Sequence, residues 1–132
     1  MRTLFKTGAT SSKPEQVWSF IKATQPVHEG THIPRSFELD LGNGTTIWVS
    51  GNATKHLQDI ARRVPVFDTQ SVAEQVMLLS LREAVKQATM DGVPQPEEIL
   101  HVSGWRLKFA PPRESGQLPS LIHARHDEPD EY

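Results

Sequence analysis

The stretch that decides the fold is FELDLGNGTTIWVS, residues 37–50. From Ser36 onward, apolar residues alternate with acidic ones, and a period of two is typical of a half-buried strand. Gly42-Asn43-Gly44 follows, and both residue types tolerate the positive φ angles of tight hairpin turns. Residues 45–50 then return as a second strand, so the stretch predicts a β-hairpin.

Helical patterns lie on both sides of this hairpin. Before it, Ser12 and Glu15 form a capping box for a short helix that we expect to end near Ala23, followed by a loop over 27–34. After it, Asn52 is the predicted cap of a helix that runs to about Arg63 and is ended by Pro65.

The longest helix is predicted from Ser71 to Met90, with Asp91-Gly92 as its stop. Its candidates for burial are apolar residues spaced along the helix: Val72, Val76, Leu79, Val85 and Ala88. The charged residues Arg82 and Lys86, like Arg62-Arg63 earlier, are interpreted as solvated faces.

A second hairpin is predicted for the last third of the chain, with one strand over 100–110, a turn over 111–116 and a return strand over 118–124. The resulting order is helix, hairpin, two helices, hairpin. We therefore expect an α+β fold in which a small antiparallel sheet packs on helices. We expect a single domain over 1–132, with a core over about 12–126 and an acidic tail over 127–132.

Composition limits the function classes. The 132 residues contain no cysteine, which excludes disulfides, thiolate zinc sites and cysteine nucleophiles. No apolar run approaches the ~18 residues of a spanning helix, so we expect no membrane partner. The start, Met1 to Ser12, lacks the apolar core of a signal peptide. If the domain is exported, we expect a longer parent chain or a dedicated secretion system to carry it.

The charge is unevenly distributed. Net charge is −2, which argues weakly against nucleic acid as a partner. The segment 127–132 holds four of the 16 acidic residues, so the rest of the chain has 12 acidic residues against 14 basic ones. A slightly basic body with an acidic tail is compatible with an RNA-cleaving domain without requiring one.

The placement of the six histidines disfavours a metal site. His28, Glu29 and His32 have the His-Glu-x-x-His order of a helical zinc site, but they fall in the loop predicted over 27–34 and not on a helix. His123 and His126 are three apart, which places them on opposite faces of a strand. We expect neither a metal nor another cofactor.

Lys55 and His56 lie in the first turn of the helix predicted after the hairpin. The N-terminus of a helix favours a phosphate oxygen, and an imidazole beside a lysine suits phosphodiester chemistry there. Asn52 and Thr54 in the same turn are candidate substrate-binding residues. The alternative is that this turn is merely exposed and polar.

Arg113 and His123 belong to the last hairpin, one in its turn and the other near the end of its return strand. A guanidinium can hold a phosphate with two parallel hydrogen bonds, and an imidazole exchanges protons near neutral pH. His123, between Ile122 and Ala124, could equally be a half-buried structural residue.

Trp48 and Trp105 lie on the two hairpins and are candidates for stacking on a base. The alternative is burial in the core, which is more common for aromatic residues in strands.

Cleavage of RNA without a metal needs a base for the 2′-hydroxyl, an acid for the leaving oxygen, and cations for the developing charge. His56, His123, Lys55 and Arg113 supply these groups, provided that the two hairpins and the helix after Asn52 converge on one site.

Two segments resemble a toxin domain found at the C-terminus of LXG-type and related polymorphic toxins. The first contains IPRSFEL (33–39), the tryptophan strand and NATKH (52–56). The second contains GWRLKF (104–109), Pro112-Arg113, Leu118-Pro119 and His123-Ala124. Together they span roughly 31–124, and Lys55, His56, Arg113 and His123 match the family pattern.

The resemblance implies a ribonuclease used in interbacterial competition and neutralised by a cognate immunity protein. It also implies delivery into the cytoplasm of a target cell, and suggests a fold of the barnase, EndoU, colicin or RelE kind. One departure is Arg106, where we expect an acidic residue. Two alternatives remain: a non-enzymatic interaction module, such as an immunity protein or adaptor, and a toxin that acts on DNA.

Overall fold

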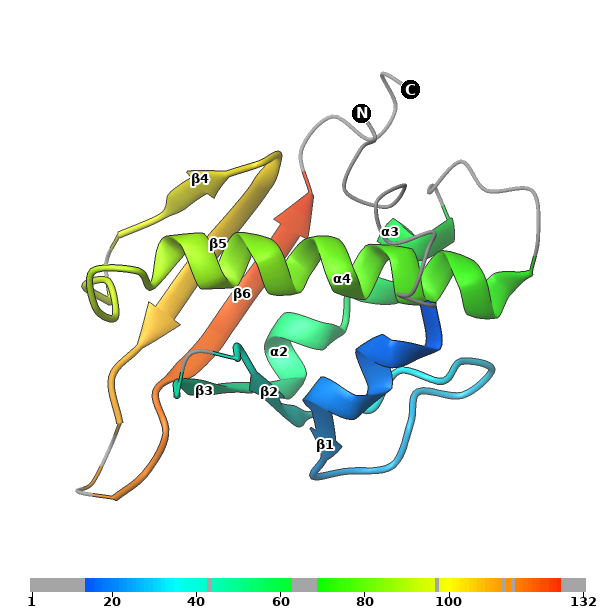
Figure 1. Ribbon diagram of the computed structural model, residues 1–132, viewed down its shortest axis with the longest axis horizontal. Coiled ribbons are helices and arrows are strands. Elements are labelled where there is room, and N and C mark those ends of the chain that lie inside the picture. Colours follow the sequence, from blue (N-terminus) through cyan, green and yellow to red (C-terminus); the bar gives the residue numbers. More distant parts are fainter. Residues whose placement is uncertain are drawn as a thin grey trace.

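The computed structural model describes residues 14–42, 44–62, 69–96, 98–112, 114 and 116–126. In this part of the chain, six strands form one sheet, and helices pack against it (Figure 1). The α+β class is confirmed. The elements in chain order are the 3-10 helix η1 (Pro14–Phe20), β1 (Ile21–Ala23), β2 (Phe37–Asp40), β3 (Thr46–Val49), α2 (Gly51–Thr54), α3 (Leu57–Arg62), α4 (Gln70–Ala88), β4 (Leu100–Val102), β5 (Trp105–Ala110) and β6 (Ser120–His126).

The sheet is mixed, whereas the sequence predicted antiparallel pairing alone. Its strand order is β1-β2-β3-β6-β5-β4. The two antiparallel groups meet where β3 and β6 pair in parallel, with Trp48 beside Ser120 and Val49 beside Leu121. Parallel neighbours need a long crossover, and here the chain between β3 and β6 supplies α2, α3, α4 and the β4–β5 hairpin. This pairing brings the two hairpin regions into one sheet.

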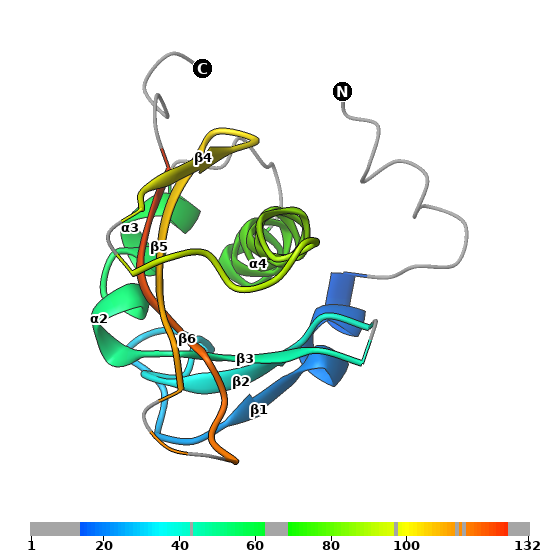
Figure 2. The same ribbon diagram turned by 90° about the vertical axis from the view of Figure 1, so that its left-hand side faces the viewer.

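The core lies between α4 and one face of the sheet (Figure 2). We call this the inner face, and the opposite one the outer face. Alternate residues of β2, β3 and β5 are buried on the inner face, while the residues between them are half-buried or exposed. The largest fully buried strand residues are Phe37, Leu39, Ile47, Trp105, Leu107 and Phe109. Burial of this apolar area is the main stabilising term, at about 25 cal/mol per Å².

The long helix is buried along a different stripe from the predicted one. Its side chains toward the core are Ala73, Met77, Leu78, Leu81, Ala84 and Val85. Val85 was predicted correctly. Val72, Val76, Leu79 and Ala88 are only half-buried, although Leu79 and Ala88 still pack against the core. Both the sheet and α3 pack against α4. These contacts on two sides decide which residues of the helix face the core, and the apolar period of the helix alone does not predict them.

Arg82 was predicted to be solvated, which is wrong. Its side chain is buried, its guanidinium stacks on the Phe20 ring at 3.6 Å, and its Nε donates to the carbonyl of Asp40 at 2.8 Å. Gly42 has a φ of +82°, and a Cβ there would lie 2.8 Å from the Arg82 guanidinium. Arg82 therefore fastens the β2–β3 hairpin and η1 to α4.

The first predicted helix is shorter than expected. Residues 21–23 form β1, which pairs antiparallel with β2 and places Ile21 opposite Leu39. The free edge of β2 offers backbone hydrogen bonds that the apolar periodicity alone could not reveal. Ser12, the expected cap, lies outside the described residues.

Two other predicted elements are interrupted by turns. Ser50, and not Asn52, caps the helix after β3 by accepting a hydrogen bond from Ala53 N, and that helix divides into α2 and α3. The strand predicted over 100–110 is a hairpin, because Ser103 and Gly104 adopt positive φ angles of 53° and 87°.

Candidate functional site

An irregularity in β6 places His123 on the outer face of the sheet. Leu121 pairs with Phe109 on β5, and His123 pairs with the preceding residue, Lys108, so Ile122 is an extra residue in the ladder. Strict alternation would put His123 on the same face as the buried Leu121. The bulge reverses this, because an extra residue shifts all later side chains to the other face. Ala124 is therefore buried, and His123 faces outward beside Lys108.

The turn between α2 and α3 brings Lys55 and His56 to the same place. α2 follows directly after β3 and lies beside β6 (Figure 1). The Nδ2 of Asn52 donates to the carbonyl of Ile122, the bulge residue, at 3.4 Å. Lys55 is exposed and His56 is half-buried.

The His56 and His123 rings lie next to each other, with centroids 6.5 Å apart and planes at 69°. This is the convergence that the proposed chemistry required of the two segments. At this separation a single phosphate group can contact both rings.

Both imidazoles favour the neutral form. Burial lowers the pKa of His56 below its ordinary value of 6.5, and Arg125 and Lys55 lower it further, while Asp59 raises it. Burial also lowers the pKa of His123, and the charges of His56, Arg106, Arg125 and Lys108 add to this effect. An imidazole that is neutral near pH 7 can accept a proton.

Sequence reasoning missed three basic residues near the histidine pair: Arg106, Lys108 and Arg125. Arg106 was noted only as a departure from the family pattern. The sequence pattern that could have identified them is a pair of basic residues two positions apart on each of two strands: Arg-x-Lys at 106–108 and His-x-Arg at 123–125. Residues two apart share a face of a strand.

Thr54 and Trp105 do not fit the substrate-binding role that we predicted. Thr54 has an exposed fraction of 0%, so it cannot touch a substrate. Trp105 is 1% exposed, and its Nε1 donates to Ser80 Oγ on α4 at 3.0 Å, which makes it a core residue.

The other candidates have mixed outcomes. Asn52 is exposed and holds α2 against β6. Trp48 is half-buried on the outer face, where its Nε1 donates to Thr24 Oγ1 at 3.2 Å. Arg113 lies outside the described residues, so its proposed role stays a prediction.

Hydrogen bonds hold the start of the Lys55-His56 turn in place. Thr54 Oγ1 donates to the carbonyl of Arg35 at 2.7 Å, and the Nε2 of His28 lies 2.9 Å from the same oxygen. Because the hydroxyl has a single proton, directed to Arg35, His28 donates to it through Nε2. Burial and then the charge of Arg35 lower the pKa of His28, which agrees with a neutral ring.

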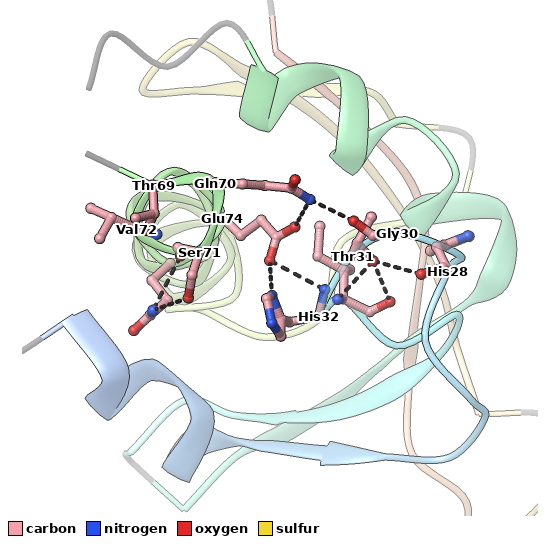
Figure 3. Close-up of polar contacts among 11 residues, drawn as sticks. His28, Gly30, Thr31, His32, Thr69, Gln70, Ser71, Val72 and Glu74 are labelled. Atoms are coloured by element: carbon pink, nitrogen blue, oxygen red, sulfur yellow. Dashed lines mark hydrogen bonds and ion pairs between the residues drawn. The ribbon is translucent and has the colours of Figure 1, made fainter. Parts of the chain in front are cut away.

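The loop that carries His28 is itself fixed to α4 (Figure 3). Glu74, 1% exposed, accepts hydrogen bonds from His32 Nδ1 at 2.9 Å and from Gln70 Nε2 at 2.7 Å. Gln70 Nε2 also donates to the carbonyl of Gly30 at 2.7 Å. The His56 turn is therefore connected through this loop to the longest helix.

The described residues hold neither a metal site nor a membrane-spanning helix. No group of three or more His, Cys, Asp or Glu residues among them is placed to hold a metal ion. None of their helices is both long and apolar enough to cross a membrane.

No protein-family model matches the sequence, and no curated protein matches it either. The resemblance to polymorphic-toxin domains therefore stays a prediction.

Proposed function

We propose that this chain is an endoribonuclease that cleaves RNA by transphosphorylation, with His56 and His123 as its acid–base pair. The observation that carries the proposal is the 6.5 Å separation of the two rings, on segments 67 residues apart that meet beside Lys55 and Lys108. Two imidazoles and neighbouring cations supply all the groups that this reaction needs, so a metal ion is not required.

The reaction balances without another reactant. One neutral imidazole removes the proton of the 2′-hydroxyl, and the resulting oxygen attacks the adjacent phosphorus. The bond from phosphorus to the 5′ oxygen breaks, and the other imidazole, in its protonated form, gives that oxygen a proton. The products are a 2′,3′-cyclic phosphate and a free 5′-hydroxyl. The two histidines end in exchanged protonation states.

The electrostatic surroundings favour His123 as the base and His56 as the acid. Every charge that acts on His123 lowers its pKa, whereas the pKa of His56 is raised in part by the Asp59 carboxylate. His56 therefore holds a proton more readily than it would without Asp59. A bound phosphate would raise the pKa of both rings, because an anion favours the charged imidazole.

Exposed Lys55 is positioned to stabilise negative charge on the non-bridging oxygens. Arg113 is proposed for the same task from the family resemblance alone. Trp48 lies on the same outer face and pairs with Ser120 of β6, two residues before the bulge residue Ile122. It is therefore available to stack on a base next to the scissile phosphate.

A pair of matched oligonucleotides tests the chemistry. Purified protein in EDTA should cleave a short RNA and leave a 2′,3′-cyclic phosphate, detected by mass spectrometry. The same strand with one 2′-deoxynucleotide at the cleaved position should resist cleavage there, because it has no internal nucleophile. Equal cleavage of both strands would contradict transphosphorylation and favour the alternative of a nuclease that acts on DNA.

We also propose, from the family resemblance, that the activity serves interbacterial competition, acts in the cytoplasm of a target cell, and is neutralised by an immunity protein. Induced expression in a bacterial host should stop growth, and the His123→Ala variant should be tolerated. A wild-type chain that is produced in folded form without harm would instead favour the non-enzymatic interaction module.

A further inference from the structure

The outer face of the last three strands gathers basic side chains in register. Arg106 on β5 lies between His101 on β4 and Arg125 on β6. One row along the same strands, Lys108 lies opposite His123. We call His101, Arg106, Lys108, His123 and Arg125 the basic face.

Two residues of the basic face lie directly opposite each other. Side chains in such positions on neighbouring antiparallel strands have Cβ atoms about 4.5–5.5 Å apart. Arg106 on β5 lies opposite Arg125 on β6, so one short stretch of a nucleic-acid backbone can reach both side chains.

The dimensions of the face exceed those of a single phosphate. Neighbouring strands are about 4.8 Å apart, and residues two apart on a strand are separated by about 6.8 Å. The basic groups therefore extend over roughly 10 Å across the strands and 7 Å along them. This area continues into His56 and Lys55 on the other side of β6.

We propose that the basic face binds the backbone of single-stranded RNA next to the scissile phosphate, with Arg106, Lys108 and Arg125 contacting adjacent phosphates. This inference rests on the proposed function, because it adds a binding track to the same site. His123 is the point at which the track meets the acid–base pair. Trp48 lies on the other side of His123, so the strand would lead from the arginine row past the histidines toward the tryptophan.

The chemistry of the face selects a backbone more than a sequence. Guanidinium and ammonium groups contact phosphates whatever the base, and such contacts make binding strongly dependent on salt. The expected ligand is therefore a flexible polyanion with regularly spaced phosphates.

Binding by fluorescence anisotropy tests the proposal in the full chain with the His123→Ala substitution, which prevents cleavage of the probe. The probe is a labelled 12-nucleotide RNA of mixed sequence, measured at several salt concentrations. The double variant Arg106→Gln/Arg125→Gln should bind at least about 10-fold more weakly at low salt, and its slope of log K against log salt should fall by about 1.4, since each lost single-strand phosphate contact contributes about 0.7.

The matched control is Lys22→Gln/Lys86→Gln, which removes the same net charge from β1 and α4. It should change affinity less than about twofold and leave the slope intact. Equal weakening by both double variants would overturn the proposal, because only net charge would then matter. So would an unchanged affinity of the arginine variant.

Two further arms keep the outcomes separate. A labelled polyglutamate of equal charge should bind much more weakly than RNA, and equal binding would overturn RNA in favour of an acidic protein as the ligand. If RNA binds through the arginines but the wild-type chain does not cut it, the proposed function fails while the binding track stands. If the wild-type chain cuts RNA but the arginine substitutions leave RNA affinity unchanged, the binding track fails while the proposed function stands.

Thermal melting of the arginine variant separates loss of binding from loss of the fold. A variant that binds poorly and keeps the cooperative melting transition of the parent chain has lost a binding site. A variant that binds poorly because it is unfolded lacks that transition. In that event Arg125→Gln alone, at an exposed position, gives the same test.

Discussion

The hydroxyl of Thr54 joins the fold to the candidate site, and its removal gives a prediction with a definite size. Thr54→Val keeps the branched shape of the side chain and removes one oxygen. That oxygen donates to the Arg35 carbonyl at 2.7 Å and receives the Nε2 proton of His28 at 2.9 Å. After the change, the Arg35 carbonyl has lost its hydrogen-bond donor and the His28 Nε2 has lost its acceptor, in a partly buried place.

Each buried polar group left unsatisfied costs about 1–3 kcal/mol. His28 is only half-buried and can turn toward water, so we expect the two groups together to cost about 2–3 kcal/mol. Thr54→Ser is the matched control, because it keeps the hydroxyl and loses one methyl group, which costs about 1 kcal/mol. Urea unfolding followed by tryptophan fluorescence measures both values.

The same variants separate positioning from binding. Thr54 immediately precedes Lys55 and His56, so loss of its hydrogen bonds should displace the His56 ring relative to His123. RNA cleavage should fall more in Thr54→Val than in Thr54→Ser, while RNA affinity stays equal in the two. If Thr54→Val is as stable and as active as Thr54→Ser, the hydrogen-bonded brace described above does not hold the turn.

Three further predictions follow from the charges and buried groups. The pKa values of both site histidines lie below 6.5. The base therefore remains neutral, and the acid remains protonated, only in a pH range below that of ordinary imidazoles. As a result, kcat/KM should peak below pH 6.5. Arg125→Gln should move that peak to higher pH, and an unmoved profile would count against the electrostatic account. Folding stability should be greatest above pH 6.5 and decline below it, because His28, His56 and His123 all bind protons more readily when unfolded; a rise in urea midpoint on acidification would refute this. Glu74→Gln should cost about 2–3 kcal/mol in urea unfolding, because hydrogen bonds to a carboxylate are worth about 1.5–3 kcal/mol; a loss below about 0.5 kcal/mol would show that the carboxylate does not fasten the loop.

Local patterns predicted the elements but not how they assemble. The alternation before Gly42 and the glycine turn identified the first hairpin because their causes are local. The parallel pairing of β3 with β6 depends on contacts between distant segments, and no local pattern indicates it. For the same reason the strand at 21–23 was predicted as helix: only the nearby edge of β2 makes an extended chain favourable there.

The candidate site was predictable in its residues and unpredictable in its geometry. Lys55, His56 and His123 were identified from residue type and family likeness. The outward direction of His123 depends on the bulge at Ile122, since regular alternation would have directed it inward. Thr54 and Trp105 were misjudged because a residue's type does not reveal its burial, and Arg82 because a long charged side chain can stack inside a fold.

The most direct test of the histidine pair compares two substrates that differ in their leaving group. Uridine 3′-(4-nitrophenyl phosphate) releases a stable anion that needs no proton, whereas the 5′ oxygen of RNA needs one. His56→Ala should slow RNA cleavage by roughly 10²–10⁴-fold and the nitrophenyl ester far less, while His123→Ala should slow both. Cleavage of RNA at the wild-type rate by both variants would contradict the account.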